Sequence, residues 1–559
     1  MRCHEVSHFT RDDATMTANR TTSWPDDNPD NSHDARLRAQ VHPAHWLNPQ
    51  PKQQYHLVVV GAGTGGLVTA AVAAGLGARV ALIERHRMGG DCLNTGCVPS
   101  KAIIRAARSW HDAKTANAQF GGPVAHGDGN FAQAFERMRE IRANIASADS
   151  AERFRAMGVD VFFGEAQFVS ANALNVGGQG LKFRRAVIAT GSRPSVPNIP
   201  GLAEIDFYTN ENIFSLREQP RHLVIIGGGP VGCELAQAFV RFGTRVTLVA
   251  RDAKLLPRDT ADASRIVYDA LVRDGVHVMT NANVVRVGRG VGDVADEEIL
   301  RANHGSPAVG NGAIHAGVDA IHAGDDAEIV VRVADRDVMV RGDALLVAVG
   351  RTPNVEKLGL DAAAVKFDLQ HGVHVDDRLR TSNHRVYAVG DVCSSLKLTH
   401  AADFQARMVV QNALFYGRKK CSALVTPWVT FTSPEVAQVG LTEEAAAKSG
   451  MAVDVVNVPM HEVDRAELDG ATEGFCRILI ARGTDRIVGA SIVSEHAGEH
   501  ISAVALAMTN GLGLSAFART MHPYPTQGEM LRKAADAWNR RKLTPAVKKL
   551  FAWYFRMVG

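Results

Sequence analysis

The sequence predicts an α/β chain in which two similar strand–turn–helix–strand units precede a C-terminal α+β domain. The first unit begins at Tyr55, where the apolar run YHLVVV is followed by GAGTGG, a stretch of small residues and the strand-like ARVALIE. The second unit follows Arg221 and repeats this order as HLVIIGGGPVGCELAQAFVRFGTRVTLVA. A buried strand, a glycine-rich turn and a helix in this order are typical of parallel β–α–β units. From Trp428 onward strands and helices alternate in a different pattern, which indicates a separate final domain.

The composition and charge are those of an ordinary globular protein. Of the 559 residues, 46% are hydrophobic and 22% are charged, and the net charge is +3. A charge balance so close to neutral gives no indication of a nucleic-acid partner. The sequence has no apolar run of about 20 residues, so it predicts no membrane span. Its first residues also lack the apolar core of a secretory signal, and we therefore expect a cytoplasmic protein.

Six segments are predicted along the chain. Residues 1–54, rich in Asp, Asn, His and Pro, are expected to form a disordered tail. The first unit occupies residues 55–205, the second occupies 206–345, and residues 346–425 return to the first. The final domain covers residues 426–539, and a basic, aromatic tail follows over residues 540–559. The polar stretch 291–327 contains AIHAG twice, which favours a loop insertion made by local duplication over a metal site built on His315 and His322.

The first glycine-rich turn has the spacing of a dinucleotide-binding site. Gly61, Gly63 and Gly66 follow the pattern GxGxxG. The first glycine permits a tight turn, the second lets a pyrophosphate approach the backbone, and the third lets helix and strand pack closely. Glu84 ends the second strand, where a carboxylate can accept hydrogen bonds from a ribose diol. Strand, turn, helix and terminal acid together predict a bound dinucleotide.

The second unit repeats the glycine spacing but lacks the acid. Its glycines are Gly227, Gly229 and Gly232, and the position that corresponds to Glu84 is Ala250. Arg251 follows directly, and Arg258 is a second candidate phosphate contact. A missing carboxylate beside a guanidinium suits the 2′-phosphate of NADPH, with NADH as the alternative cofactor. The other interpretation is that both arginines are solvated surface charges.

Two of the seven cysteines lie close together. Cys92 and Cys97 are part of GGDCLNTGCVPSK, which leads into a helix predicted to begin near Pro99. A helix N-terminus carries partial positive charge and lowers the pKa of a thiol, and Lys101 adds a further positive charge. So few cysteines in so long a chain indicate a reducing compartment with one redox-active pair.

GGDCLNTGCVPSK resembles the redox-active motif of the class I pyridine nucleotide-disulfide oxidoreductases, which include dihydrolipoamide dehydrogenase, glutathione reductase and mercuric reductase. The resemblance runs from about residue 55 to about residue 537. It is supported by ATG at Ala189–Gly191, AVGRTPN at Ala348–Asn354, YAVGDV at Tyr387–Val392 and GEA at Gly164–Ala166. It implies two Rossmann-like domains, one for FAD and one for NAD(P), followed by a C-terminal dimerisation domain.

The resemblance also assigns roles to individual residues. NADPH would reduce FAD, and FAD would reduce a Cys92–Cys97 disulfide, with Cys97 as the flavin-proximal thiol and Cys92 as the thiol that attacks substrate. Lys101 and Glu234 resemble the ion pair beside the flavin, although a surface salt bridge is the alternative. Further cofactor contacts are expected at Ala166, Thr190, Gly191 and Asp391 for FAD, and at Gly350 for NADPH.

The chain departs from the family pattern near its C-terminus. The usual signature HxHPTxxE reads HPYPTQGE here, so that Tyr524 takes the place of the catalytic histidine and Glu529 keeps its place. Tyrosine is a poor general base at neutral pH. Mercuric reductases are similar in having Tyr at this position, but they also carry a C-terminal cysteine pair, whereas this chain has no cysteine after Cys476. The resemblance implies a homodimer in which Tyr524 and Glu529 complete the site of the other subunit.

These observations predict a mercuric-reductase-like enzyme acting on a metal ion or another small molecule. One alternative is a dihydrolipoyl dehydrogenase that uses lipoamide and NAD. Another, of a different class, is a membrane-associated redox adaptor for a protein partner. It rests on the tail RRKLTPAVKKLFAWYFRMVG, whose basic and aromatic residues suit peripheral contact with an anionic membrane. A terminal helix packed on the protein is the interpretation of the tail that we prefer.

Overall fold

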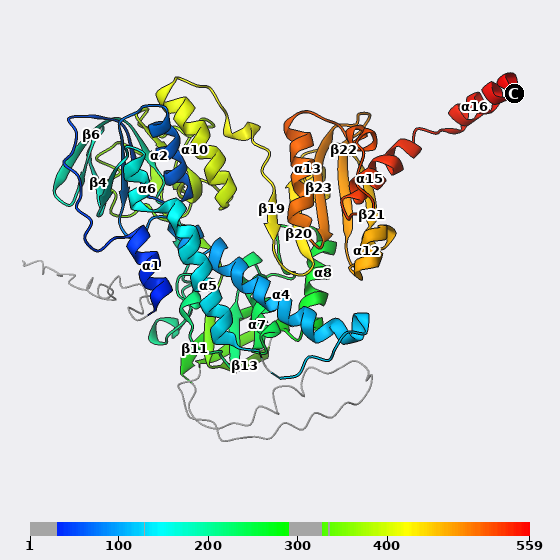
Figure 1. The fold of residues 1–559 in the computed structure, drawn as a ribbon, viewed down its shortest axis with the longest axis horizontal. Coiled ribbons are helices and arrows are strands. Elements are labelled where there is room, and N and C mark those ends of the chain that lie inside the picture. The colour runs from blue at the N-terminus through cyan, green and yellow to red at the C-terminus, as the bar shows by residue number, and fades with distance from the viewer. Residues whose placement is uncertain (1–30, 128, 290–326, 334–335) are drawn as a thin grey trace, which may run out of the picture.

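The protein is described by a computed structural model that covers residues 31–127, 129–289, 327–333 and 336–559. Figure 1 shows a body built from sheets and helices, with the final domain beside it and the last helix standing away from both. The predicted insertion at 291–327, with His315 and His322, lies outside the described residues except for Ala327. The described part contains no helix long and apolar enough to cross a membrane.

The first unit forms a largely parallel sheet. Strands β1 (Tyr55–Val60), β2 (Val80–Glu84) and β3 (Asp160–Phe163) run parallel, and β1 also pairs with β6 (Gln179–Ile188), which is joined by β18 (Val386–Ala388). Strands β4 (Ala166–Ser170) and β5 (Ala173–Val176) extend the sheet in antiparallel register. Helix α2 (Thr64–Gly75) connects β1 to β2 and packs along α10 (Thr399–Leu414). Residues near 390 thus return to the first unit, as expected.

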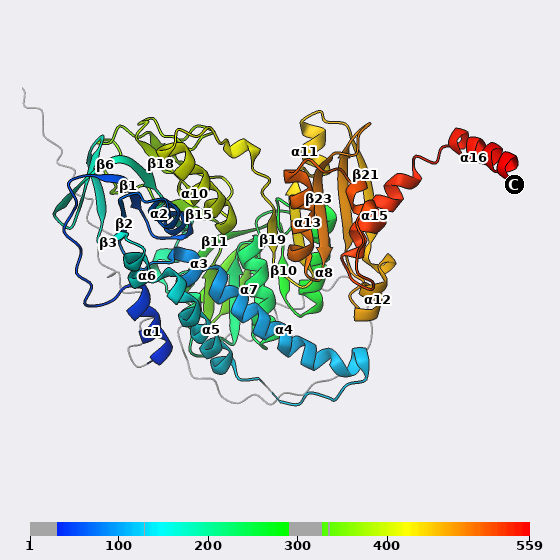
Figure 2. The same ribbon diagram turned by 45° about the horizontal axis from the view of Figure 1, so that its top comes forward.

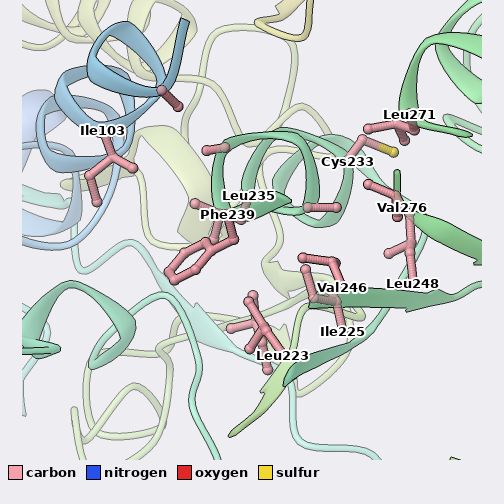
Figure 3. Packing of buried hydrophobic residues seen from close by; sticks show 14 of the residues in the cluster. Ile103, Leu223, Ile225, Cys233, Leu235, Phe239, Val246, Leu248, Leu271 and Val276 are labelled. Carbon is pink, nitrogen blue, oxygen red and sulfur yellow. The ribbon is translucent and has the colours of Figure 1, made fainter. Parts of the chain in front are cut away.

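The second unit is a separate four-stranded parallel sheet in the order β10 (His277–Met279), β9 (Arg245–Val249), β8 (His222–Ile226) and β14 (Ala344–Val347). Helix α7 (Pro230–Arg241) follows the glycine turn after β8, and α8 (Ala261–Arg273) follows β9. Figure 3 shows Leu235 and Phe239 of α7 packing between Leu223 of β8 and Ile103 of the neighbouring helix α4 (Cys97–Phe120). This shared core joins the second unit to the helix that begins at Cys97.

Two further sheets complete the body. Strands β11 (Ala282–Arg289), β12 (Ala327–Val333) and β13 (Arg336–Gly342) form an antiparallel sheet beside the second unit. The final domain has a five-stranded antiparallel sheet in the order β19 (Trp428–Thr430), β20 (Glu435–Gly440), β23 (Ile487–Ser494), β22 (Phe475–Ala481) and β21 (Val453–Pro459). Helices α13 (Ala497–Thr509) and α15 (Glu529–Arg540) pack on this sheet.

The helices between the two units lie side by side in Figure 2. They are α4 (Cys97–Phe120) and α5 (Phe131–Ile145), and α6 (Ala151–Ala156) follows them. The stretch from about residue 101 to 157 is not one continuous helix. The structure divides it, and α4 begins at Cys97, two residues before the expected start, so that the second cysteine lies in the first turn of the helix.

The prediction of a disordered tail over residues 1–54 is wrong for its described part. Residues 32–41 form α1 (Ser32–Val41), capped by the side chain of Asn31, and Leu37 and Val41 are fully buried against the body. The following segment is also anchored, because the side chain of Asn48 exchanges two hydrogen bonds of 2.8 Å with the backbone of Phe163 in β3. Because most residues of this segment are polar, its composition gives no sign of the few apolar side chains that pack against the rest of the protein.

The C-terminal tail contains α16 (Pro545–Val558), which extends away from the rest of the chain in Figures 1 and 2. None of its residues is buried. A terminal helix was expected and is present, but the expected packing on the protein is wrong for this single chain.

Candidate functional site

A cavity of about 380 Å³ lies between the first unit, the second unit and the N-terminus of α4. Its volume is within the range of cofactor and ligand sites. It is lined by most of the residues that the sequence singled out for FAD and for the redox reaction: Gly61, Gly63, Glu84, Cys92, Cys97, Lys101, Ala166, Thr190, Gly191, Glu234 and Asp391. Residues more than 300 positions apart are therefore brought to one site.

The glycine turn after β1 has no room for side chains. Gly61 has a φ of +100°, and a Cβ there would lie 2.4 Å from the carbonyl oxygen of Ala189. A Cβ on Gly66 would lie 1.8 Å from the carbonyl oxygen of Gly61. Gly63 is the N-cap of α2, so the unpaired N–H groups of this helix face the cavity. The turn thus presents backbone donors where a pyrophosphate would lie.

Glu84 ends β2 and is nearly buried. Its carboxylate accepts hydrogen bonds from the backbone N–H of Ala62 at 2.7 Å and of His86 at 2.8 Å. Burial raises the pKa of this carboxyl, while the two N–H donors and Arg85 oppose the rise. Each carboxylate oxygen retains acceptor capacity, so the group fits the ribose diol expected from the sequence.

Two of the quoted motifs contact each other at the cavity wall. The hydroxyl of Thr190 donates to the carbonyl of Asn354 at 2.7 Å, and the amide of Asn354 donates back to the carbonyl of Thr190 at 2.9 Å. Gly191 adopts a φ of +67°. Asp391 accepts a hydrogen bond of 2.6 Å from Ser192, which directly follows the ATG turn.

The two cysteines lie within hydrogen-bond contact of each other at the start of α4. Cys92 is on α3 (Gly90–Asn94), and Cys97 is exposed to the cavity, with its Sγ 3.4 Å from the hydroxyl of Thr399. The hydrogen bond from Cys92, then the Thr399 hydroxyl and the charge of Lys101, lower the pKa of Cys97 to about 6, although burial opposes this. The same contact raises the pKa of Cys92. Cys97 is thus the thiolate of the pair at neutral pH.

Lys101 and Glu234 form the expected ion pair, with Nζ and Oε2 2.8 Å apart. Glu234 lies on α7 with 6% of its side chain exposed, so this is not a surface salt bridge. Its other oxygen accepts a hydrogen bond of 2.9 Å from the backbone N–H of Phe431, and Lys101 lies 4.6 Å from the centre of that ring. The pair therefore links α4, the second unit and the start of the final domain.

Sequence reasoning missed three polar side chains of the cavity. Arg351 lies 2.7 Å from the carboxylate of Asp91, beside Cys92, and 3.6 Å from that of Asp391. Asn210 donates to the same Asp91 carboxylate at 2.9 Å. Thr399 is the third. Arg351 belongs to the quoted AVGRTPN motif and could have been found there, whereas Asn210 and Thr399 carry no local signal.

The second glycine turn has the geometry of the first. Gly227 has a φ of +128°, and a Cβ on Gly232 would lie 1.9 Å from the carbonyl oxygen of Gly227. A Cβ on Gly229 would meet nothing within 4 Å, which leaves the approach open. Ala250 is buried, and Arg251 and Arg258 are both exposed, with Arg251 no closer than 4.0 Å to the carboxylate of Asp252. Gly350, with a φ of +139°, follows β14 at the same end of the sheet.

Tyr524 and Glu529 do not line this cavity. Tyr524 is 70% exposed and donates a hydrogen bond of 3.0 Å to Asp464, which together with the charge of Asp464 raises the pKa of the phenol. Glu529 is buried and pairs with Arg532 instead of with Tyr524. Within a single chain, the structure keeps these two predicted residues apart from the cysteines.

The residues present fit an FAD molecule. Glu84 offers acceptors for a ribose, the turn at Gly63 leaves room for a pyrophosphate, and Asp391 faces the same cavity as the thiols. These groups would hold FAD, whose isoalloxazine ring supplies two-electron transfer between a nicotinamide and a disulfide.

The chain resembles known flavoprotein reductases over most of its length. Residues 55–406 match the family model of pyridine nucleotide-disulphide oxidoreductases, and residues 426–535 match the dimerisation domain of the same family. Mercuric reductase of Staphylococcus aureus is 32% identical over 486 residues, which is 87% of this chain and 83% of that protein. Dihydrolipoyl dehydrogenase of Staphylococcus aureus is 31% identical over 488 residues, which is 86% of this chain and 95% of that protein.

Solved structures agree with this family assignment. The HOCl-induced flavoprotein disulfide reductase RclA from Escherichia coli superposes with a TM-score of 0.71 at 27% identity, covering 86% of this chain and 99% of that one. The relatives named mercuric reductase and dihydrolipoyl dehydrogenase match the same part of this chain. The similarity therefore identifies the family and the fold, but it does not identify the substrate. Because the match extends from the first glycine turn to α15 and includes both cysteines, the chain is an enzyme of the pyridine nucleotide-disulphide oxidoreductase family.

Proposed function

We propose that this enzyme is an NADPH-dependent flavoprotein reductase whose Cys92–Cys97 pair delivers electrons to a soft metal ion, with Hg(II) as the candidate substrate. The observation that carries the proposal is the combination of a thiolate at Cys97 with Tyr524 in place of a histidine. A phenol whose pKa is raised by Asp464 is a poor proton donor and acceptor for thiol exchange at neutral pH. A soft metal ion needs thiolate ligands and no proton for a leaving thiol.

NADPH and Hg(II) are the only reactants that this reaction needs to balance its electrons. NADPH would supply two electrons as a hydride, FAD held by Glu84 and the Gly61 turn would supply their transfer to the Cys92–Cys97 pair, and the two thiols would give them to Hg(II). Hg(II) becomes Hg(0), NADPH becomes NADP⁺, and one proton is released. The relatives named mercuric reductase support this substrate class. The chain has no cysteine after Cys476, which is fully buried, so we infer that the metal reaches Cys92 directly from small thiols in solution.

Anaerobic NADPH oxidation with Hg(II) held in excess thiol tests the proposal. We expect turnover that disappears in Cys92→Ser and persists in Cys476→Ser, whose thiol lies in the final domain away from the cavity. If NADPH reduces the flavin and Hg(II) does not reoxidise it, the metal is not the acceptor. Faster NADH formation from dihydrolipoamide than NADPH oxidation by Hg(II) would instead favour the dihydrolipoyl dehydrogenase alternative.

We further infer a homodimer in which Tyr524 and Glu529 of one subunit complete the cavity of the other. The family's dimerisation domain at 426–535 supports this, as does the separation of these residues from the cysteines within one chain. Tyr524 is largely exposed on the final domain and thus accessible to a second copy. An active monomer, seen by activity measurement at dilutions that dissociate the enzyme, would contradict the inference.

Helix α16 supports a second proposal, peripheral contact with an anionic membrane. Lys548, Lys549 and Arg556 share one side of the helix by its 3.6-residue period. The opposite side is apolar and exposed, with Leu550, Phe551, Tyr554, Met557 and Val558 between 47% and 68% accessible. Residues 540–559 contain six Lys or Arg and no Asp or Glu. A basic helix with aromatic residues is suited to the headgroup region of an anionic bilayer.

Co-sedimentation with vesicles tests this contact. The full-length enzyme should sediment with vesicles that contain phosphatidylglycerol and remain in solution with pure phosphatidylcholine, and deletion of residues 540–559 should abolish the binding. Small-molecule turnover that survives the deletion would leave room for the redox-adaptor alternative. Sedimentation unchanged by the deletion, or a change of oligomeric state without vesicle binding, would refute membrane contact and assign α16 to another partner.

A further inference from the structure

The N-terminal arm, residues 31–54, contacts the segment that contains Cys92 and leads into Cys97 at the start of α4. We define that segment, residues 85–96, as the redox loop. The arm lies before the region that matches the family model, which begins at residue 55. Its two ends are attached to different places, since α1 packs against α5 and its last residue, Val41, bonds to Met88 of the redox loop, whereas Asn48 pairs with Phe163 on the edge strand β3.

A buried relay connects α1 to the redox loop. Asp34 is 3% exposed, and its carboxylate accepts a hydrogen bond of 3.0 Å from the guanidinium of Arg142 on α5. The same guanidinium donates at 2.9 Å to the backbone carbonyl of Asn94, two residues after Cys92. The side chain of Asn94 in turn donates to the carbonyls of Met88 at 3.0 Å and Gly90 at 2.8 Å. One arginine thus fixes the turn between the two cysteines, and Asp34 fixes the arginine.

The end of α1 holds the start of the loop as well. The carbonyl of Val41 accepts a hydrogen bond of 3.0 Å from the backbone N–H of Met88, and the ring of His42 contacts the carbonyl of His86. The arm therefore restrains the loop before Cys92 through Met88 and after Cys92 through Asn94. A planar guanidinium that donates from its two terminal nitrogens to two different partners holds those partners in a fixed relative position, and a buried guanidinium requires its carboxylate partner.

We propose that the N-terminal arm is a positioning element of the redox site, in which Asp34, acting through Arg142, holds Asn94 so that the two cysteine side chains stay in contact. The proposal rests on the redox role of Cys92 and Cys97 but not on the identity of the acceptor. Asp34 touches neither substrate nor cofactor and is a positioning residue.

The sign of one measurable effect separates positioning from simple electrostatics. Removal of a negative charge near a thiol stabilises its thiolate and lowers its pKa. Loosening the loop has the opposite effect, because the hydrogen bond from Cys92 is the largest cause of the low pKa of Cys97. Asp91 and Lys101, the charged groups that face Cys97, are unchanged by a substitution at Asp34. An upward shift of the Cys97 titration in a variant of Asp34 therefore reports loss of geometry.

The experiment compares Asp34→Asn with Asn48→Ala in the full-length holoenzyme. Each variant breaks one anchor of the arm, but only the first breaks the relay. Both should lower the thermal midpoint. In enzyme reduced anaerobically with dithionite, the pH at half-maximal alkylation of Cys97 by iodoacetamide should rise by about one unit in Asp34→Asn and stay constant in Asn48→Ala. The labelled peptides are quantified by mass spectrometry.

A second variant keeps the test decisive if Asp34→Asn folds poorly. Arg142→Lys preserves the buried charge pair, but one ammonium cannot hold Asp34 and the Asn94 carbonyl in the same fork. It should reproduce the upward shift with a smaller loss of stability. Equal alkylation profiles in all variants, with only the thermal midpoint changed, would show that the arm contributes to the stability of the fold and not to the position of the cysteines. That result would overturn the proposal. Because the alkylation assay uses no electron acceptor, failure of the Hg(II) test would not affect the proposal for the N-terminal arm.

Discussion

The two β–α–β units of this enzyme have the same backbone at their glycine turns and different chemistry at the ends of their second strands. A Cβ on Gly61 would lie 2.4 Å from the carbonyl oxygen of Ala189, and a Cβ on Gly227 would lie 2.4 Å from that of Ala348. At the strand ends, the first unit places the buried carboxylate of Glu84, and the second places the methyl group of Ala250. The turn serves any pyrophosphate, whereas the strand end discriminates between riboses.

The units also differ in what surrounds them. The first contributes to a cavity of about 380 Å³ that includes the cysteines, while Arg251 and Arg258 of the second are exposed. A cavity suits a cofactor that stays bound, and an exposed surface suits a cofactor that exchanges in every turnover. The comparison therefore predicts that equivalent changes in the two units have different consequences.

Substitution of the third glycine of each turn should have the largest effect. Gly66→Ala and Gly232→Ala each place a Cβ less than 2 Å from a backbone oxygen, at 1.8 Å and 1.9 Å respectively, so the turn must shift. We expect Gly66→Ala to be purified without flavin. Gly232→Ala should retain flavin absorbance while its reduction by NADPH, followed by stopped flow, slows about 100-fold. Loss of flavin from both variants would contradict the expectation that the first unit binds FAD and the second binds the nicotinamide cofactor.

Changing the strand end should have the next largest effect. Ala250→Glu combined with Arg251→Ala gives the second unit the chemistry of the first. The ratio of kcat/KM for NADPH to that for NADH should then fall about 100-fold, because a charge-assisted contact to the 2′-phosphate is exchanged for one to a ribose diol. Arg265→Ala, at another exposed arginine of the same unit, is the matched control. An unchanged ratio would identify Arg251 as a solvated surface charge.

The sequence predicted the parts of the site that depend on local backbone geometry. Glycine spacing, the acid at Glu84 and the cysteine motif are each set within a few residues, and the structure confirms that most of them line one cavity. The Lys101–Glu234 pair needed the resemblance, because these two residues lie 133 positions apart.

The N-terminal arm could not be predicted in this way. Its buried contacts join Asp34 to Arg142, which are 108 positions apart, and a polar composition gives no sign of such a pairing. The position of Asn210 against Asp91 likewise depends on tertiary packing alone. In both cases a carboxylate is bound by a side chain from an element that shares no sequence pattern with its own, so only the fold reveals the contact.

The smallest effect is expected where the two units meet, at Lys101. Lys101→Met removes one of the groups that lower the pKa of Cys97, while the hydrogen bonds from Cys92 and Thr399 remain. The pKa should rise from about 6, since loss of a nearby positive charge destabilises the thiolate. Alkylation of the reduced enzyme by iodoacetamide should therefore slow about 10-fold at pH 6 and remain unchanged at pH 9, where the thiolate dominates in both proteins.

Lys114→Met, at an exposed lysine further along α4, is the control for that measurement. It changes the same charge on the same helix without contact to Glu234 or to the cysteines. If Lys101→Met and Lys114→Met gave the same pH profile, the hydrogen bonds from Cys92 and Thr399 alone would set the reactivity of Cys97, and the ion pair at the junction of the units would serve only to hold α4 against α7. A shift confined to Lys101→Met would show that the charge of Lys101, which is paired with Glu234 of the second unit, activates the thiol of Cys97.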